Sequence, residues 1–469
     1  MSSTDSFPKR HLGLFQLVMI NVIAVDSIRT LPFSASYGFS LIFYYLLAAF
    51  LFFIPTAFIA AELGTAWPIT GGIYVWVREA FGKKCSLVVI WLHWIYNVIW
   101  FPTIVALTAG TAAYFFDVSL QNNKCYLGIS VLIIFWLATL LNLFGMKLSS
   151  WISSAGALIG TLIPMLLIAI LGLIWWKKGN TLAISFTKES FFPAISSNKN
   201  IAYLTNVLFG LMGLEMAATH SREMINPKKD YPRSLAISVG IILFSIITSS
   251  LAVSVVIPPS DLNLVTGAMQ AFSVFFNSLQ IPWGIPILAG CIILGGVSGI
   301  SAWIIGPTKG LMVASEDGSL PKCLSKKNRW GVPSNLLLLQ AGLVSILCLA
   351  FVIYPTVNSS FWILSVITAQ LALVVYIFLY LAAFKLHFSK SQVPRPFRIP
   401  GGKWGVGICA SLGCLSSVVV CILGFIPPEA VSNEGVISYE ISIISGMLVA
   451  IGIPLFIIKK MSKKKNKLS

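Results

Sequence analysis

The amino-acid sequence predicts an all-α polytopic membrane protein with twelve transmembrane helices. Of its 469 residues, 57% are hydrophobic and only 10% are charged, whereas a soluble globular domain carries about 25% charged residues. Charged residues are absent between Trp330 and Phe384, between Leu235 and Ser260, and between Trp404 and Pro428. Because a membrane span needs about 20 apolar residues, each of these stretches can hold one or more spans.

The apolar stretches, taken in order, place the spans near residues 12–36, 40–62, 85–116, 126–146, 150–176, 201–221, 234–257, 285–313, 334–354, 360–385, 405–426 and 441–458. An even number of spans puts both termini on one side. Most of the 32 basic residues fall in the connections on that side and in the tail that follows the last span. The opposite side holds only Lys124, Lys177, Lys178, Lys188 and Lys199. Since basic loops stay inside, we expect a multi-pass protein of the cytoplasmic (inner) membrane with both termini cytoplasmic.

Composition also excludes several classes of protein. The net charge of +17 arises in connections at the membrane surface, so it does not indicate nucleic-acid binding. The eight cysteines are scattered without a Cys-x-x-Cys pair, which argues against a disulfide framework or a zinc site. The sequence contains no metal-binding His/Glu spacing, glycine-rich phosphate loop or serine elbow. We therefore expect no enzyme activity, no metal and no cofactor.

Two of the predicted spans are interrupted by polar residues or glycines. The first span breaks between Ala24 and Pro32, and the sixth passes through Gly210 and Gly213 to the carboxylate of Glu215. An ionisable group near mid-membrane costs several kcal/mol unless it faces a cavity or a partner. Irregular backbone is tolerated at that depth only where it lines such a cavity. Two interrupted helices therefore predict a substrate site.

The order of the spans indicates an inverted repeat of five plus five helices. The two interrupted spans lie five spans apart, and short amphipathic segments at 71–82 and 263–272 occupy matching positions. Paired breaks of this kind are typical of secondary transporters, whereas a channel should show a pore-lining ring or filter loop. The expected regions are a cytoplasmic tail (1–11), two five-helix repeats (12–176 and 201–385), helices 11 and 12 (405–458) and a basic cytoplasmic tail (459–469).

Four segments resemble motifs of the amino acid/polyamine/organocation superfamily, in the same order along the chain. They are residues 68–82 (PITGGIYVWVREAFG), 213–215 (GLE), 223–233 (EMINPKKDYPR) and 305–311 (IGPTKGL). Residues 217–220, 303–307, 376–380 and 397–403 most resemble the glutamate/GABA antiporter branch. The resemblance implies a leucine-transporter-like fold with broken helices 1 and 6. It places an amino acid substrate between these two breaks and helices 3, 8 and 10.

The two breaks suit the two charged groups of an α-amino acid. Free N–H groups around Ser27 to Arg29 would hold the carboxylate, and free carbonyls of Phe209 to Leu211 would hold the ammonium group. The side-chain pocket would fall to Tyr96, Asn97, Trp303 and the tyrosines of helix 10. The candidate substrate-binding residues are Val25, Asp26, Ser27, Ile28, Arg29, Tyr96, Asn97, Phe209, Gly210, Leu211, Gly213, Trp303, Tyr376 and Tyr380. The gating or proton-coupling candidates are Glu215, His220 and Lys309.

Several of these residues have an alternative role that the sequence leaves open. Asp26 and Arg29 are three residues apart and could neutralise one another, or Arg29 could meet a substrate carboxylate. Tyr376, Tyr380 and Trp303 could serve packing or contact the substrate. Glu215 could be a gate, a proton site or a tie to a neighbouring helix. A further group is predicted to be structural: His93 and His220 as hydrogen-bonded helix residues, and Arg222, Glu223 and Lys309 as an interfacial ion network.

Substrate and coupling are also left open. Where the glutamate/GABA antiporters carry a carboxylate in helix 8, this chain has Gly299, and their long C-terminal plug is not expected here. Arg29 favours an acidic substrate, whereas Asp26 leaves a cationic one possible. Residues 149–156 lack the helix 5 lysine of proton-coupled relatives, and Ser298 and Ser301 are weak sodium ligands because serines often bond back to their own helix.

We therefore expect an exchanger that trades an amino acid for a related amino acid or its decarboxylated amine, with glutamate/GABA-like substrates favoured. A proton-coupled amino acid or polyamine uptake permease is the alternative. The expected partners are small-molecule amino acids and membrane lipid, and the protein is a monomer or a homodimer.

Overall fold

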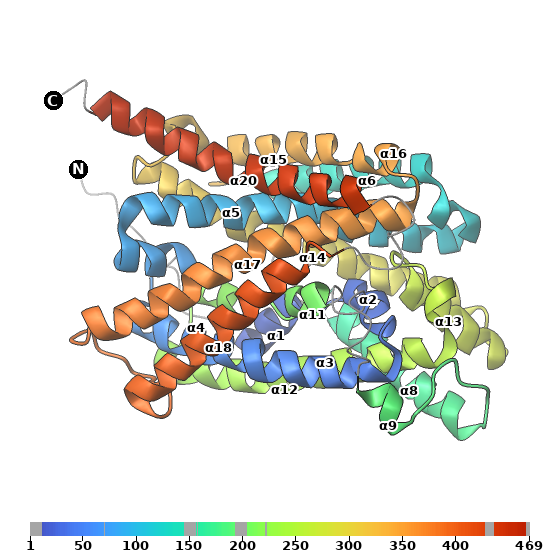
Figure 1. The fold of residues 1–469 in the computed structure, drawn as a ribbon. Coiled ribbons are helices and arrows are strands. Elements are labelled where there is room, and N and C mark those ends of the chain that lie inside the picture. Colours follow the sequence, from blue (N-terminus) through green and yellow to red (C-terminus); the bar gives the residue numbers. More distant parts are fainter. Residues whose placement is uncertain are drawn as a thin grey trace.

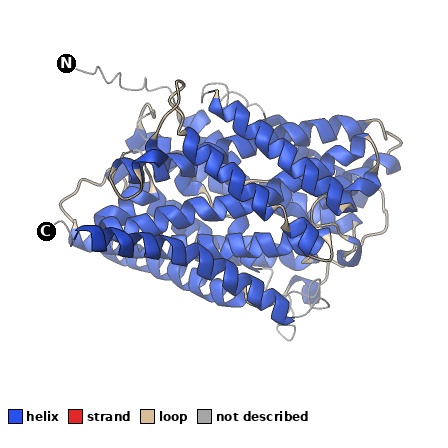
Figure 2. Cartoon of the chain, turned by 90° about the horizontal axis from the view of Figure 1, so that it is seen from above, coloured by secondary structure: helices blue, strands red, loops and turns tan. Residues whose placement is uncertain are grey.

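The computed structural model describes residues 12–69, 71–144, 156, 158–192, 204–220, 223–426 and 436–465, without the side chains of 219, 220, 302, 436 and 461–465. Helices make up almost all regular structure in these residues, and they contain no strand (Figure 2). A single isolated bridge joins Leu12 to Met224. Its two backbone hydrogen bonds link Leu12 to Glu223 and Ile225, just before the first span and just after the sixth.

Eleven helical segments in the described residues are long and apolar enough to cross a membrane. The helices before the middle of the chain are α1 (Leu14–Val25), α2 (Leu31–Ala35), α3 (Leu41–Ala48), α4 (Ile54–Ala66), α5 (Ile73–Ala112), α6 (Lys124–Leu143), α8 (Ile163–Lys177), α9 (Lys188–Phe191) and α11 (Leu204–Gly210). Those after it are α12 (Pro227–Val256), α13 (Gly267–Ser278), α14 (Gly284–Glu316), α15 (Ser334–Leu347), α16 (Ala350–Ile353), α17 (Val357–Ser389), α18 (Gly402–Leu423) and α20 (Val436–Lys465).

The predicted class, an all-α polytopic membrane protein, is confirmed. In the segment expected as the sixth span, the described residues form a helical run from Leu204 to Ala218 that is apolar but too short to be counted among the eleven. The count of twelve spans therefore stays a prediction. The second span is longer than predicted, from Gly38 to Ala66. The short segment before the third span forms the first part of α5, which begins at Ile73. A kink at Gly82 separates it from the rest of the helix, and the φ of 82° at this position favours glycine. The matching segment α13 begins at Gly267, four residues later than predicted.

Two long helices, α5 and α17, form the centre of the bundle. They pack against one another, while α14 packs on α5 and α18 packs on α17 (Figure 1). Buried residues make up 83% of the most apolar stretch of α5 and of α17, but only 17% of the corresponding stretch of α20. One end of the bundle, at the left of Figure 1, carries the start of α5 and the C-terminal ends of α17 and α20. The opposite end carries α9, α13 and α16.

Two glycines bring the fifth and eighth spans into backbone contact. Gly160 lies in η6 (Leu158–Leu162), a π-helical turn that leads into α8, and it faces Gly295 of α14. A Cβ atom on Gly160 would lie 2.2 Å from the Gly295 nitrogen, and one on Gly295 would lie 2.5 Å from the Gly160 oxygen. Neither backbone can give way as a flexible side chain could, so both positions require glycine.

Replacing Gly160 by alanine should therefore destabilise the protein by about 1–3 kcal/mol, the usual cost of overpacking a filled interface. The measurement is the thermal unfolding midpoint of the purified protein in detergent. Gly407→Ala in α18 is the matched control, because nothing lies within 4 Å of the Cβ added there and alanine favours helix over glycine. Equal midpoints for the two variants would show that the contact between η6 and α14 is not tight.

Candidate substrate site

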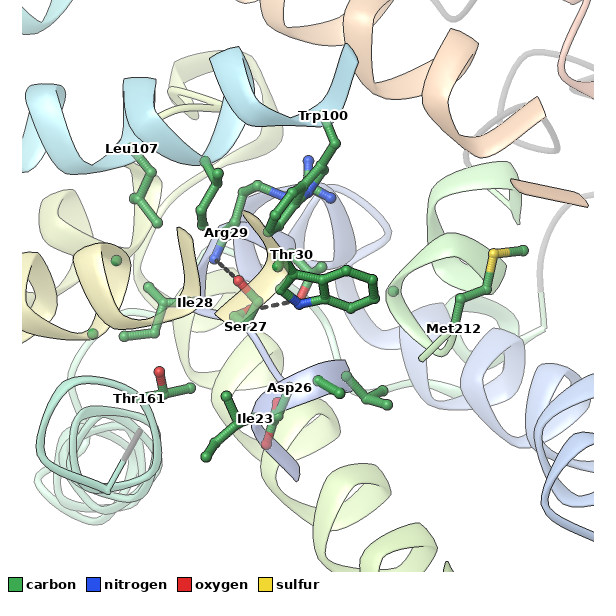
Figure 3. Close-up of a pocket in the computed structure, with 18 of the residues that line it drawn as sticks. Ile23, Asp26, Ser27, Ile28, Arg29, Thr30, Trp100, Leu107, Thr161 and Met212 are labelled. Carbon is green, nitrogen blue, oxygen red and sulfur yellow. Dashed lines mark hydrogen bonds between the residues drawn. The ribbon is translucent and has the colours of Figure 1, made fainter. Parts of the chain in front are cut away.

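The first span is interrupted at Asp26 and Ser27. α1 ends at Val25, both residues then take extended backbone angles, and helical structure resumes as the short η1 (Ile28–Thr30). The Ser27 hydroxyl accepts a hydrogen bond from the Arg29 N–H at 3.3 Å, and the Thr30 hydroxyl donates to the Ser27 carbonyl at 2.7 Å (Figure 3). These local bonds, typical of serine and threonine at a helix start, stabilise the non-helical backbone of the break.

The sixth span is interrupted directly beside the first. α11 ends at Gly210, and η7 (Leu214–His220) begins after Gly213, which has φ +124°. A Cβ on Gly213 would lie 2.7 Å from the Ala24 carbonyl oxygen, so only glycine allows this close approach of the two chains. No backbone N–H in the described residues donates to the carbonyls of Gly210 or Leu211. The Phe209 carbonyl and the Arg29 N–H, both expected to be free, are taken: the first accepts from the Met212 N–H at 3.2 Å and the second donates to Ser27. The two breaks thus meet, but they leave fewer backbone groups available than the sequence predicted.

A cavity of about 80 Å³ lies against both breaks. One water molecule needs about 10–15 Å³ of such a cavity, so the cavity has room for several waters or for a small ligand. Ten of the fourteen candidate binding residues line it: Val25, Asp26, Ser27, Ile28, Arg29, Tyr96, Asn97, Phe209, Gly210 and Trp303. The other four, Leu211, Gly213, Tyr376 and Tyr380, are not part of its wall.

The sequence reasoning missed several wall residues, of which Thr30, Trp100, Thr161, Met212, Gly295 and Gly296 are examples. Helical spacing could have found some of them. Trp100 follows Tyr96 by four residues and so shares its helix face, and Gly299 precedes Trp303 by the same interval. Thr161 carried no such signal.

Arg29 is buried in this cavity without an acidic partner. Its side chain is 2% exposed, Nη1 donates to the Ser365 hydroxyl at 3.2 Å, and Nε has no hydrogen-bond partner. The guanidinium lies 5.3 Å from the Phe209 ring centre and 5.8 Å from that of Phe361, which gives modest cation–π stabilisation. A hydroxyl and two rings do not neutralise a buried positive charge.

Asp26 is oriented away from Arg29 and makes no ion pair with it among the described salt bridges. Its Oδ2 accepts a hydrogen bond from the Ser245 hydroxyl of α12 at 2.5 Å. Its Oδ1 has no partner, although the side chain is only 3% exposed. Of the two alternatives that the sequence left open for this pair, mutual neutralisation is therefore excluded by the geometry.

The two tyrosines of α17 hold helices together beside the cavity. The Tyr376 hydroxyl donates to the Glu215 carboxylate and accepts from the Gly213 N–H at 2.7 Å. It thereby ties the second break to α17. The Tyr380 hydroxyl is 2.6 Å from the Thr56 hydroxyl of α4, so Tyr380 joins two helices outside the cavity.

A second, smaller cavity of about 20 Å³ lies on the other side of Glu215. Its lining includes His93, Glu215, Met216 and Lys309, and both His93 Nδ1 and Glu215 Oε1 lack a hydrogen-bond partner. Glu215 and Lys309, both gating candidates, are thus brought together. The side chain of the third, His220, and the whole of Arg222 lie outside the described residues.

Comparison with known proteins identifies the family of the chain. The family model "Amino acid permease" matches residues 12–451. An uncharacterized transporter of Legionella pneumophila is 47% identical over 452 residues, 96% of this chain and 97% of its own length. A glutamate/gamma-aminobutyrate antiporter of Lactococcus lactis is 27% identical over 98% of this chain and 92% of its own. A probable agmatine/putrescine antiporter of the same species is 25% identical over 96% and 95%.

The match extends over the breaks, the cavity and nearly every described span. It confirms the superfamily that the motifs resemble, and it identifies a transporter and not an enzyme. This chain belongs to the amino acid permease family.

Proposed function

We propose that the protein exchanges amino acids across the cytoplasmic membrane by alternating access, and that its preferred substrate carries a second carboxylate. The observation that carries this proposal is the buried Arg29 guanidinium, which lines the cavity and makes no ion pair among the described salt bridges. Basic residues at the end of the bundle that holds the start of α5 and the C-terminal ends of α17 and α20 favour a cytoplasmic position for that end.

The chemistry of the cavity fits an acidic amino acid. A guanidinium binds a carboxylate bidentately with two parallel hydrogen bonds, and in the described structure only one of its donors is taken by Ser365. Leaving a buried charge without an opposite charge is costly. A substrate carboxylate would supply that charge, and an aliphatic substrate would not.

The remaining groups of the substrate would meet the two breaks. The carbonyl of Gly210, which lines the cavity, offers an acceptor for the ammonium group, and the N–H at the start of η1 offers a donor for the α-carboxylate. Both contacts use backbone dipoles, so they suit any α-amino acid. Selection among amino acids then depends on Arg29 and on the walls formed by Tyr96, Trp100 and Trp303.

Exchange is favoured over simple uptake because relatives that cover almost the whole chain are named as antiporters. In proteoliposomes, uptake of labelled glutamate should require a lumen preloaded with glutamate or a related amino acid. Empty liposomes should take up little label, and an added proton gradient should not replace the internal amino acid. Rapid uptake into empty vesicles would instead indicate a permease of the uptake type.

Arg29→Ala should abolish recognition of acidic amino acids. Loss of one charge-assisted bidentate pair from a buried site should raise the half-saturating concentration at least tenfold, since such bonds are worth about 1.5–3 kcal/mol. Competition by glutamate, GABA and leucine against a labelled substrate measures this preference. Arg29→Lys keeps the positive charge but loses the bidentate guanidinium, so its affinity for acidic amino acids should be intermediate. Ser365→Ala removes only a neighbouring hydroxyl and should keep the preference for acidic amino acids. Unchanged glutamate binding in Arg29→Ala would refute the contact.

Tyr376 lies where its hydroxyl bonds can keep the two cavities separate, a role that we call a latch. Met212 lines the larger cavity and Glu215 the smaller one, and the Tyr376 hydroxyl bonds to the backbone and to the carboxylate between them. We propose that this hydroxyl keeps the substrate cavity closed towards the smaller cavity until the second break rearranges.

Tyr376→Phe should then raise the leak of preloaded substrate from proteoliposomes that have no substrate outside, relative to the exchange rate. Tyr380→Phe is the matched control, because Tyr380 lies one helical turn further along α17 and its hydroxyl bonds to Thr56. The ratio of leak to exchange is the measurement. If both variants leak equally, or neither does, the latch assigned to Tyr376 does not exist.

A further inference from the structure

Asp26 is a buried carboxyl group that amino acid exchange at Arg29 does not use. It lines the substrate cavity, is 3% exposed, and has one oxygen bonded to Ser245 and the other without a partner. Figure 3 shows it beside Ile23, below Ser27, at the end of α1. A buried polar atom without a partner is uncommon in folded proteins, and because Asp26 belongs to the cavity wall, a group that enters the cavity can supply the missing partner.

The position of Asp26 selects the kind of ligand. Asp26 directly precedes Ser27, the residue that caps η1, and the N–H at the start of η1 would hold the substrate carboxylate. Two carboxylates that share a buried site cannot both stay ionised at low cost, and one of them takes up a proton. An acidic substrate also brings a second carboxylate, which under the proposed function occupies Arg29, the basic residue of the described cavity wall, and so leaves no positive charge there for Asp26.

The groups around Asp26 do not remove the conflict. Among the described residues, α1 carries no other charged residue, α12 presents the Ser245 hydroxyl, and η6 and α14 present Thr161 and glycines to the cavity. The titratable or charged groups described on the packed elements are Arg29 on η1, Tyr44 and Tyr45 on α3, Glu215 on η7, Cys291, Lys309 and Glu316 on α14, and Lys228, Lys229, Asp230, Tyr231 and Arg233 in the first turns of α12. Arg29 is directed to Ser365, and Glu215 is held by Tyr376.

We propose that Asp26 is a proton-binding site that loads together with an acidic amino acid. The free Oδ1 takes a proton from the water of the cavity when the substrate enters, and the carboxyl group becomes neutral. The proton leaves to water on the opposite side after the substrate has left. Ser245 stabilises the ionised form between these events, because its hydroxyl donates to Oδ2. This inference rests on the proposed exchange of acidic amino acids.

The test measures proton movement and amino acid movement in the same proteoliposomes. A pH-sensitive dye in the lumen reports protons, and labelled glutamate reports exchange against luminal GABA over a series of external pH values. The wild-type protein should move protons inward with glutamate, and its uptake should rise as the external medium is acidified. In Asp26→Asn, whose side chain cannot titrate, any exchange that remains should be independent of external pH and should move no protons.

Ser245→Ala provides a second test that leaves the carboxyl group in place. Removal of the donor to the ionised form should shift the pH of half-maximal uptake upwards, because protonation becomes easier. This shift tests the proposal even if Asp26→Asn does not fold. A pH profile in Ser245→Ala equal to the wild type, or proton movement that persists in Asp26→Asn, would overturn the proposal.

The outcome also separates this inference from the proposed function. Absence of glutamate exchange at every pH in the wild-type protein would refute the proposed function itself. Glutamate exchange without proton movement would leave that function intact and refute only the role of Asp26.

Discussion

The rest of the structure depends on one constraint: peptide groups inside a membrane must find hydrogen-bond partners. A continuous helix satisfies this internally, and two of the described spans do not. Their interruptions are possible because they face each other, with Gly213 against the Ala24 carbonyl at a distance that no side chain would allow. Local bonds of Ser27 and Thr30 and the Tyr376 hydroxyl satisfy part of the exposed backbone. The groups that remain give the cavity its polarity.

Charged residues have different kinds of partners at the end of the bundle and at its centre. At the end near the start of α5 they form ion pairs, Arg78 with Asp317 at 2.7 Å and Arg395 with Glu62 at 3.1 Å, and Glu62 also forms a hydrogen bond with His387 at 3.0 Å. At the centre, Arg29, Asp26 and Glu215 are each held by one hydroxyl, from Ser365, Ser245 and Tyr376. The paired charges fix the connections between spans. The central ones remain incompletely satisfied, which is the condition under which a charged ligand gains most from binding.

The sequence allowed the fold class and ten of the residues that line the cavity to be predicted, because hydropathy and breaks in apolar runs depend on the chain itself. It did not allow the partners of individual side chains to be predicted. Asp26 and Arg29 have the spacing of an intrahelical ion pair, but the extended backbone at Asp26 and Ser27 removes that geometry. Tyr376 and Tyr380 share a helix face, yet the register between α17 and its neighbours directs one to Gly213 and the other to Thr56. Such registers arise from packing across the whole bundle.

The composition of the cavity wall places selectivity on the first span. The walls from η6 and α14 consist largely of small residues, Gly160, Gly295, Gly296 and Gly299. Arg29 lies instead on the short η1 that follows the break. A substrate that neutralises Arg29 therefore stabilises the arrangement of the break itself, and it favours the conformation in which the two breaks stay together. Recognition of charge and the conformational change of transport would then use the same few residues.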